Sequence, residues 1–381
     1  MVFEQLRDWV LVVARVELEQ VKEDTKDEAD LIYLVANLYG GQGRYDEAEP
    51  LYKECLAKQK TILGSDHPDT LTSMNNLAYL YQSQGKYDDA ESLYKDCLAK
   101  KKTILGSDHP DTLTSMNNLA AFYESQGKYD EAEPLYKECL AKQKTILGSD
   151  HPDNLTSMNN LAGLYRSQGK YDKAEPLFMD CLAKRVTILG SDHPHTLTSM
   201  NNLAGLYRSQ GKYDEAEPLY KECLAKHETI LGSDHPNTLA SLNNLAGFFN
   251  SQGKYGEAEP LYKACLEKYK ARLGSDYPDT LMSMNDLAVF YRKQGKFDEA
   301  EPLFKESLAK QKTILGSDHP NTLRAMYGLV KLYVDQGKFD EAEPLYQLHL
   351  KNCETLLGPD DGLSIAIREN LDNVEEIQSE V

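Results

Sequence analysis

The chain has 381 residues, of which 41 % are apolar, and a formal net charge of −19. This acidic balance argues against wholesale binding to nucleic acid, which needs a basic surface, and no apolar run approaches the roughly 20 residues of a membrane-spanning helix. No secretory signal is recognisable, because Glu4 and Asp8 precede the short apolar run at 10–14, where positive charge is expected. We therefore expect a cytoplasmic protein with neither nucleic acid nor a membrane among its partners.

A block of 42 residues recurs along nearly the whole chain with little drift. It is marked by a Gln-Gly pair whose glycine falls at Gly43, Gly85, Gly127, Gly169, Gly211, Gly253, Gly295 and Gly337. A fixed period of this size indicates one supersecondary unit stacked on copies of itself. Such a chain is held together by contacts between neighbours, and it offers an extended surface instead of a single deep pocket.

The first predicted element is a helix over 4–21, one period before the second helix of the first repeat. Its apolar positions are Leu6, Trp9, Val10, Val13 and Val21. We expect this helix, within residues 1–25, to cap the repeats as a half repeat.

Eight repeats are then predicted over 26–357, each consisting of a helix, a turn and a second helix. In the second repeat the first helix opens at Asp66-His67-Pro68-Asp69. An Asp cap and a proline in the first turn satisfy or dispense with the unpaired amides there. The apolar positions of this helix follow helical spacing: Leu71, Met74, Leu77, Ala78 and Tyr81. Gly85 can take the positive φ that ends it.

The second helix of each repeat is predicted to be the longer one. In the second repeat its apolar face consists of Ala90, Leu93, Tyr94, Cys97, Leu98, Ile104 and Leu105. Prolines such as Pro50 and Pro134 are expected within its first turn, where no intrahelical hydrogen bond is lost.

The last predicted element is a helix over about 362–378, within a second half repeat at 358–381. Ile365 and Leu371 hold its apolar face. Asp372 stands where the second repeat has Ala78, and a charge at this position would tolerate no further neighbour. The sequence thus predicts 18 helices, nine of each kind.

The packing residues Leu77, Ala78, Tyr81, Gly85, Tyr87, Ala90 and Tyr94 follow the order of large and small residues in the tetratricopeptide repeat, which the chain resembles. The standard period of that family is about 34, and the additional residues lengthen the second helix by about two turns. With its Leu-Gly-x-Asp-His-Pro and Asn-Asn-Leu-Ala runs, the longer unit resembles the kinesin light chain subclass. The resemblance implies an all-α, right-handed superhelical solenoid of tetratricopeptide-type helix-turn-helix repeats, whose first helices line a concave groove for extended peptides.

Cysteine and histidine recur once per repeat. Six of the seven cysteines are 42 residues apart, and Ser307 fills the next equivalent position. We interpret them as small core residues, with no metal site and no disulfide. The histidines that precede proline are assigned to the turn between repeats. No HExxH, Gly-x-Ser-x-Gly or phosphate-loop motif occurs, so we expect no enzyme activity and no cofactor.

The first helices carry an asparagine at the same inward position in six successive repeats. We call this set the asparagine ladder: Asn75, Asn117, Asn159, Asn201, Asn243 and Asn285. An amide offers both donor and acceptor, so the ladder could pair with the backbone of an extended peptide whatever its sequence. The alternative is that these side chains bond neighbouring helices.

Two other inward positions vary between repeats, and there we predict the specific part of the groove. Three successive first helices carry a glycine, which costs about 1 kcal/mol in a helix; these are Gly163, Gly205 and Gly247. The glycines could clear room for a ligand side chain beside a positive wall of Arg166, Arg208, Arg292, Lys293 and Lys331. Guanidinium groups pair well with carboxylates, which favours an acidic peptide. The alternative is an ordinary solvated face.

We therefore interpret the chain as a non-catalytic protein–protein interaction scaffold or adaptor. It would act as a monomer and bind an extended acidic peptide in its concave groove. Two alternatives remain. The first is a structural or self-assembling repeat module, which head-to-tail contacts in solution would favour. The second is the sensor part of a larger signalling system.

Overall fold

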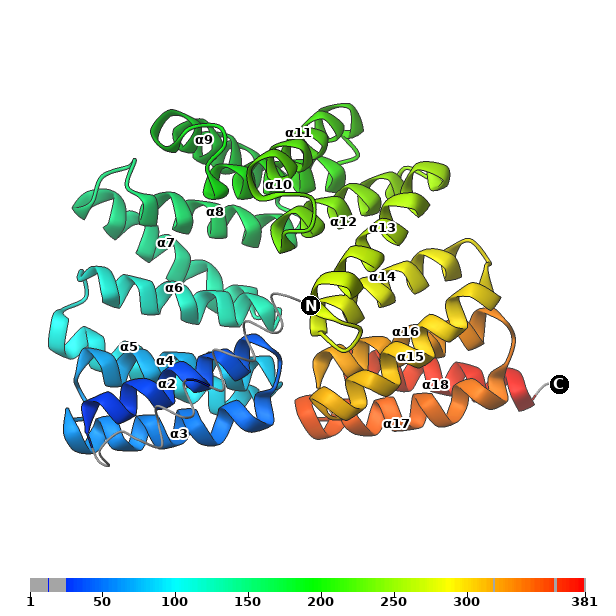
Figure 1. Ribbon diagram of the computed structural model, residues 1–381, viewed down its shortest axis with the longest axis horizontal. Helices are drawn as coiled ribbons and strands as arrows, with labels where there is room; N and C mark the ends of the chain where they lie inside the picture. Colours follow the sequence, from blue (N-terminus) through cyan, green and yellow to red (C-terminus); the bar gives the residue numbers. More distant parts are fainter. Residues whose placement is uncertain (1–12, 14–24, 318, 360–361, 380–381) are drawn as a thin grey trace. The chain divides into compact units, whose positions relative to one another are not determined.

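The computed structural model describes residues 13, 25–317, 319–359 and 362–379. Every regular element in these ranges is an α-helix, and the 17 helices are labelled α2 to α18 (Figure 1). The predicted all-α solenoid of helical repeats is confirmed, whereas its right-handed superhelical course stays a prediction. The capping helix expected over 4–21 lies, apart from Val13, outside the described residues.

The helices alternate between a shorter and a longer kind. The first helices have 16 residues each and are α2 (Lys26–Gly41), α4 (Pro68–Ser83), α6 (Pro110–Ser125), α8 (Pro152–Ser167), α10 (Pro194–Ser209), α12 (Pro236–Ser251), α14 (Pro278–Lys293) and α16 (Pro320–Asp335). The second helices have 18 or 19 residues and are α3 (Tyr45–Ile62), α5 (Tyr87–Leu105), α7 (Tyr129–Ile146), α9 (Tyr171–Leu189), α11 (Tyr213–Leu231), α13 (Tyr255–Leu273), α15 (Phe297–Leu315) and α17 (Phe339–Leu357). The last helix, α18, spans Gly362–Ser379.

The described chain divides into two compact units. The central unit consists of residues 56–78 and 88–261, and the terminal unit of the described residues in 1–55, 79–87 and 262–381. Within each unit every helix packs on the next one along the chain, from α6 to α12 in the central unit and from α14 to α18 in the terminal unit (Figure 1). The stacking of neighbouring repeats predicted from the period is therefore present in both units.

The turn inside each repeat depends on its glycine, as predicted. Gly85 has a φ of 79°, in the left-handed region that favours glycine. The chain then reverses, and the Lys86 amide donates to the Tyr81 carbonyl at 2.8 Å. This bond satisfies one of the carbonyls that would otherwise remain unpaired at the end of α4.

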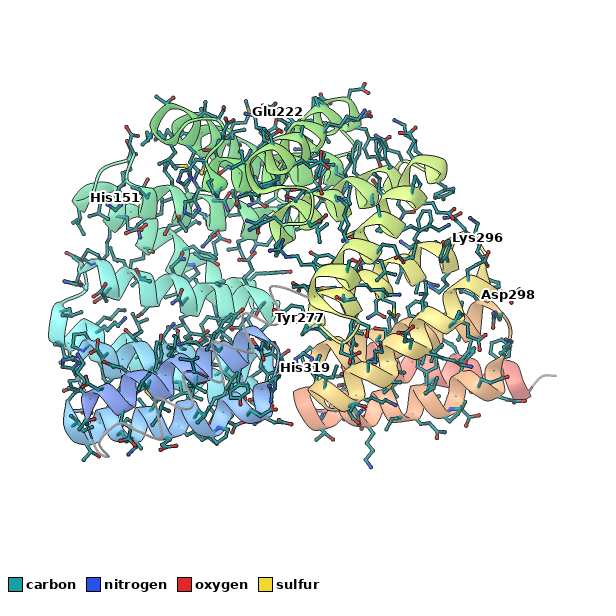
Figure 2. All side chains as sticks on the ribbon, in the orientation of Figure 1. His151, Glu222, Tyr277, Lys296, Asp298 and His319 are labelled. Carbon is teal, nitrogen blue, oxygen red and sulfur yellow. The ribbon has the colours of Figure 1, made fainter. Side chains whose placement is uncertain are left out.

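The cap of the first helices differs from the prediction, because histidine performs it instead of aspartate. In α6 the Asp111 amide donates to His109 Nδ1 at 3.2 Å, and His151 at the start of α8 accepts in the same way (Figure 2). Proline at the first helical position needs no partner, so the histidine ring is left to serve the next amide. The recurring histidines thus have a structural role in these turns.

The prolines of the second helices also lie elsewhere than predicted. Pro134 is inside α7, which begins at Tyr129, and therefore lies in the second turn. Its missing N–H removes the hydrogen bond that the Asp130 carbonyl would accept. Because Asp130 is exposed, water can bind this carbonyl and limit the cost.

Most residues predicted for the core are buried or half-buried, but Leu80 is buried although it was not predicted, and an isoleucine near the end of five second helices is exposed. Ala90, Tyr94, Cys97 and Leu98 are buried in α5, but Ile104 is 45 % exposed. The equivalent residues Ile62, Ile146, Ile188 and Ile230 are exposed as well. Because a second helix is roughly 3–5 Å longer than its first helix, its last turn has less surface to pack against.

The seven cysteines are buried, which agrees with their interpretation as small core residues. Each thiol with a described partner also donates to a carbonyl of the first helix, as Cys181 does to Leu155 at 3.2 Å. The hydroxyl of Ser307 donates to the Leu281 carbonyl at the same distance. Cysteine and serine thus fill the same role at this position.

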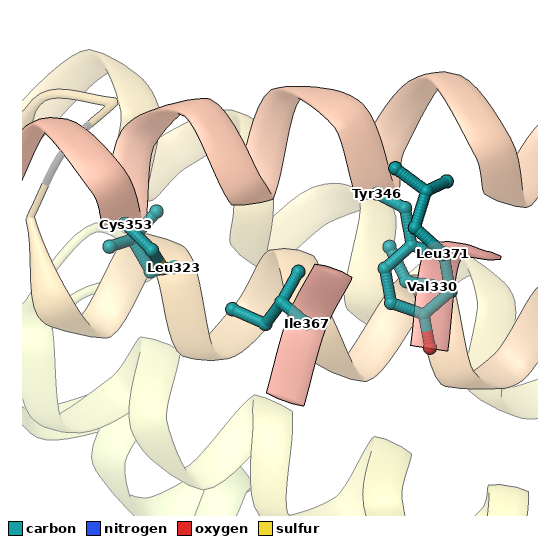
Figure 3. Close-up of a cluster of buried hydrophobic side chains, with 6 residues drawn as sticks. All are labelled: Leu323, Val330, Tyr346, Cys353, Ile367 and Leu371. Carbon is teal, nitrogen blue, oxygen red and sulfur yellow. The ribbon is translucent and has the colours of Figure 1, made fainter. Parts of the chain in front are cut away.

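The last helix covers the end of the terminal unit. Ile367 and Leu371 pack into a cluster with Leu323, Val330, Tyr346 and Cys353 (Figure 3). Ile365 is 40 % exposed, so its assignment to the buried face was wrong.

Candidate functional site

The asparagine ladder joins neighbouring first helices in the central unit. Each bond runs from the second asparagine of an Asn-Asn pair to the first asparagine of the preceding repeat. The donor–acceptor pairs, each at 3.2 Å, are Asn118 Nδ2 to Asn75 Oδ1, Asn202 Nδ2 to Asn159 Oδ1 and Asn244 Nδ2 to Asn201 Oδ1. In addition, Ser157 Oγ donates to Asn117 Oδ1 at 3.4 Å. The amide oxygens of these four ladder residues therefore serve the solenoid, as the alternative interpretation proposed.

This arrangement restricts what a ligand can use. The four asparagines are half-buried, so they retain contact with the surface. With its oxygen bonded to the next repeat, an asparagine has its N–H groups left as donors. A ligand on the ladder would therefore have to supply acceptors, such as carbonyl or carboxylate oxygens.

The ladder does not extend unchanged into the terminal unit. Asn285 is only 4 % exposed and could not contact a ligand without a rearrangement, so its place in the predicted groove was wrong. The repeat of Asn285 has Asp286 as its second residue, and the next repeat carries Tyr327 and Gly328, where the five repeats before them have an asparagine pair. The regular inter-repeat bond therefore has no equivalent donor at this position.

The space beside Gly205 is occupied by the arginine of the preceding repeat. A Cβ atom placed on Gly205 would lie 2.8 Å from Arg166 Nη1 and 3.6 Å from Tyr220 Oη. Similarly, a Cβ on Gly163 would lie 3.8 Å from Glu124 Oε1. Gly205 thus accommodates a protein side chain 39 residues earlier, and at Gly163 the equivalent side chain lies at ordinary contact distance. This differs from the empty room for a ligand predicted at these two glycines.

The electrostatic character of this face changes along the central unit. Glu124 accepts a hydrogen bond from Tyr136 Oη at 3.0 Å, and burial raises the pKa of its carboxyl although Tyr136 and Arg166 oppose the shift. Burial also raises the pKa of Tyr220, against the effect of Arg208 and Arg166. The face therefore turns from acidic at Glu124 to basic at Arg166 and Arg208.

The remaining basic residues of the predicted wall belong to the terminal unit. Arg292 forms an ion pair with Asp335 of the next repeat, so its charge is already balanced. Lys331 Nζ lies 5.3 Å from the centre of the Tyr327 ring and 3.4 Å from Asn370 Oδ1. Lys293 is exposed at the end of α14.

A cavity that the sequence analysis missed lies between α4, α5 and α6 in the central unit. Its volume is about 260 Å³, and its lining includes Leu71, Thr72, Asn75, Lys101, Ile104 and Asn118. At the position of Lys101 the following three repeats have Gln143, Arg185 and His227, which are 3 %, 4 % and 7 % exposed. The half-buried Lys101 leaves this space open. The signal was present in the sequence as a variable position within a constant helix.

Ion pairs between repeats connect successive second helices. Glu133 in α7 accepts from Lys137 at 2.5 Å and from Lys170 of the next repeat at 3.2 Å. Despite partial burial, these lysines lower the pKa of its carboxyl to about 2. The same arrangement recurs at Glu49, Glu91 and Glu217.

Within the described ranges, no group of three or more His, Cys, Asp or Glu side chains is placed to hold a metal ion. Nor does any helix in this part of the chain have the length and apolar character needed to cross a membrane.

Similarity to solved structures extends over most of the chain. The TPR-like repeats of a Podosopora anserina protein, ascribed to a kinesin light chain, are 32 % identical over 54 % of this chain and 98 % of theirs, with a TM-score of 0.47. Yeast Tom70 has a TM-score of 0.61 at 16 % identity, covering 94 % of this chain and 66 % of its own. The quorum sensor NprR from B. thuringiensis has a TM-score of 0.55 at 14 % identity, covering 92 % and 94 %. The latter two likenesses show the fold.

No curated protein matches the sequence. The profile of the tetratricopeptide repeat matches it in seven overlapping segments: 27–103, 80–144, 111–185, 183–229, 195–271, 237–313 and 279–355. These segments cover most of the chain and follow the helix pairs described above. The family predicted from the packing residues is thereby confirmed, and the chain belongs to the tetratricopeptide repeat family.

Proposed function

We propose that the chain is a non-catalytic adaptor that binds an extended acidic peptide along the first helices of its central unit. Tetratricopeptide repeats are typically scaffolds for protein–protein interaction. The observation that carries the proposal is the part of the asparagine ladder at Asn75, Asn117, Asn159 and Asn201, whose oxygens accept hydrogen bonds from the neighbouring repeat and whose N–H groups are available as donors. A regular row of donors suits the regular row of carbonyl oxygens in an extended backbone.

The preference for an acidic peptide comes from Arg166 and Arg208. Both are half-buried on the same face as the ladder, and both influence the Tyr220 hydroxyl. The net charge of the chain does not oppose this attraction, because salt screens exposed charges beyond about 8 Å at physiological ionic strength. Arg292, Lys293 and Lys331 were predicted as part of the same wall, and we retain them only as a second basic area of the terminal unit.

The test is selection from a random peptide display library, followed by affinity measurement on the selected peptides. We expect acid-rich sequences to be enriched. The Arg166→Glu/Arg208→Glu variant should weaken their binding by on the order of 2–5 kcal/mol if the arginines are desolvated in the complex. Binding should also weaken with rising salt.

The matched control is Lys102→Glu/Lys144→Glu, which makes the same charge change at exposed positions of second helices. This variant should bind the selected peptides nearly as well as the wild type. Equal loss in both variants would mean that only net charge matters, and selection of neutral or basic peptides would contradict the proposed ligand class. Concentration-dependent assembly of the wild type without any peptide selection would favour the structural alternative.

A further inference from the structure

Arg185 is a buried cation that has only uncharged partners. Its side chain is 4 % exposed and lies between α8 and α10. Nη1 donates to the His195 carbonyl and to Ser199 Oγ, each at 2.9 Å, and Nη2 donates to Thr156 Oγ1 at 3.2 Å. Among the described residues no carboxylate pairs with it, and burial lowers the pKa of its guanidinium.

A buried charge without a counter-ion is expensive. The cost of desolvating a guanidinium is several kcal/mol, and neutral acceptors recover only part of it. Packing does not require this cost, because Gln143 fills the equivalent position one repeat earlier and is 3 % exposed. The presence of arginine at position 185 is therefore not explained by its contribution to the stability of the fold.

A second change accompanies Arg185 across the repeat boundary. The residue that supplies its carbonyl acceptor is His195, where the preceding junction has Asp153. Relative to the pair of Gln143 and Asp153, this junction thus gains a cation and loses an anion. Two coupled changes of this kind remove the negative charge that would otherwise face the guanidinium.

The acidic groups near this junction already have other partners. Asp192 pairs with Lys226 at 3.2 Å, and Asp180 pairs with Lys184 at 3.1 Å. The pKa of His195 is lowered by burial and then by the positive charges of Arg185 and His193. The local field is therefore positive.

We propose that Arg185, His195 and Thr156 form an oxyanion subsite that takes an aspartate or glutamate side chain of the bound peptide. This inference rests on the proposed peptide-binding function and assigns one of its subsites. Thr156 is exposed, and its hydroxyl, which donates to the Pro152 carbonyl at 2.9 Å, also accepts from the guanidinium. A carboxylate oxygen in place of this hydroxyl gives Arg185 a charged partner.

The position of the subsite fits a peptide on the ladder. Thr156 and Asn159 are three residues apart on α8, and residues with this spacing lie on the same face of a helix. The Asn159 oxygen accepts from Asn202 at 3.2 Å, so its N–H groups are the part of the amide available to a ligand. A peptide backbone bound there brings an acidic side chain within reach of Arg185.

The experiment compares two repeat junctions of the chain, the one with Arg185 and His195 and the preceding one with Gln143 and Asp153. Fluorescein-labelled decaglutamate is titrated into the wild type, into Arg185→Gln/His195→Asp and into the reciprocal variant Gln143→Arg/Asp153→His. The first variant reproduces the preceding junction and should fold normally, yet bind roughly tenfold more weakly or worse, as expected for a lost charge-assisted hydrogen bond. The reciprocal variant should bind more tightly than the wild type. Circular dichroism melts of all three proteins check the fold.

A second arm separates this inference from the proposed function. Thermal unfolding is compared in inorganic phosphate and in chloride at matched ionic strength, and phosphate should stabilise the wild type but not Arg185→Gln/His195→Asp. Equal decaglutamate binding by the wild type and this variant, with loss in Arg166→Glu/Arg208→Glu, would overturn the subsite and keep the groove. Phosphate stabilisation that depends on Arg185 without any decaglutamate binding would keep the oxyanion subsite and overturn the peptide function. No effect in either arm would overturn both.

Discussion

His349 makes the last repeat sensitive to acid. Its ring is 3 % exposed in α17 and lies 5.7 Å from the ring of Tyr327, centre to centre. Within the described part of the chain Nδ1 has no hydrogen-bond partner, so nothing nearby supports a charge. Burial lowers the pKa of His349 to about 4. The ring is therefore neutral in the folded protein at pH values where an unfolded histidine is protonated.

The direction of the effect follows from proton linkage. Because the folded pKa lies below the ordinary value of about 6.5, the unfolded state binds more protons between these two values. The contribution of the neutral His349 ring to the free energy of unfolding is therefore fully present above about pH 6.5. It is lost as the pH is lowered through about 4. At pH 5 the loss is about 2 kcal/mol, which corresponds to a roughly thirtyfold larger population of the opened repeat.

Hydrogen exchange of peptides from residues 339–357, measured by mass spectrometry, reports this opening. The control is His349→Ser, because Ser307 occupies the equivalent position and is fully buried. Comparing the two proteins at the same pH cancels the intrinsic pH dependence of exchange. We expect similar protection at pH 7.5 and roughly thirtyfold faster exchange in the wild type at pH 5. The same ratio at both pH values would refute the assignment of acid sensitivity to His349.

Three further predictions concern the cysteines, a pair of helical glycines and the ion pairs of Glu133. The seven cysteines should resist a thiol reagent in the native protein and react together on unfolding in urea, because all are buried and burial raises the pKa of Cys265 to about 11; fast reaction of any thiol without urea would show an opened repeat. Gly205→Ala should leave the melting temperature unchanged or raise it, because only the flexible end of Arg166 has to move and alanine is favoured in a helix by about 1 kcal/mol. Gly328→Ala should destabilise by about 1–3 kcal/mol, because the new Cβ would lie 2.4 Å from the buried ring of Phe304; similar urea midpoints for the two glycine variants would contradict this contrast. Glu133→Gln should cost on the order of 1 kcal/mol in urea unfolding at pH 7, where its partly exposed lysine pairs are screened. The difference should disappear as the pH falls through about 2, where the wild-type carboxyl is protonated, and a difference that persists in acid would show that the ion pairs are not its cause.

The features predicted correctly from sequence are those that one repeat determines by itself. The left-handed glycine at Gly85 and the buried Cys97 depend on the turn geometry and on the apolar face of a single helix pair. Helical periodicity and turn chemistry are local signals, and the repetition of each signal strengthens it. The errors within a repeat concern single positions, such as the cap at His109, where proline shifts the first unpaired amide by one residue.

The site was harder to predict because its side chains bind across repeat boundaries. The Asn75 oxygen meets Asn118, 43 residues later, and Arg166 lies over Gly205, 39 residues later. Helical spacing shows that these residues share a face, but it does not show which neighbour takes the donor or fills the space. That choice depends on rotamers and on the distance between stacked helices, which a periodic sequence does not reveal.

In a nearly constant repeat, however, contacts between neighbouring repeats can be recognised from residues that deviate together from the common pattern. Where one residue departs from the common pattern, the residue that it touches in the neighbouring repeat can depart as well. Arg166 comes with Gly205, and Arg185 comes with His195. A single deviation can result from drift, whereas a deviation matched by its contact partner changes the charge or shape of one junction. Specificity in this solenoid should therefore be sought at junctions where both partners differ from the common pattern, and the junction of α8, α9 and α10 is one where the change is in charge.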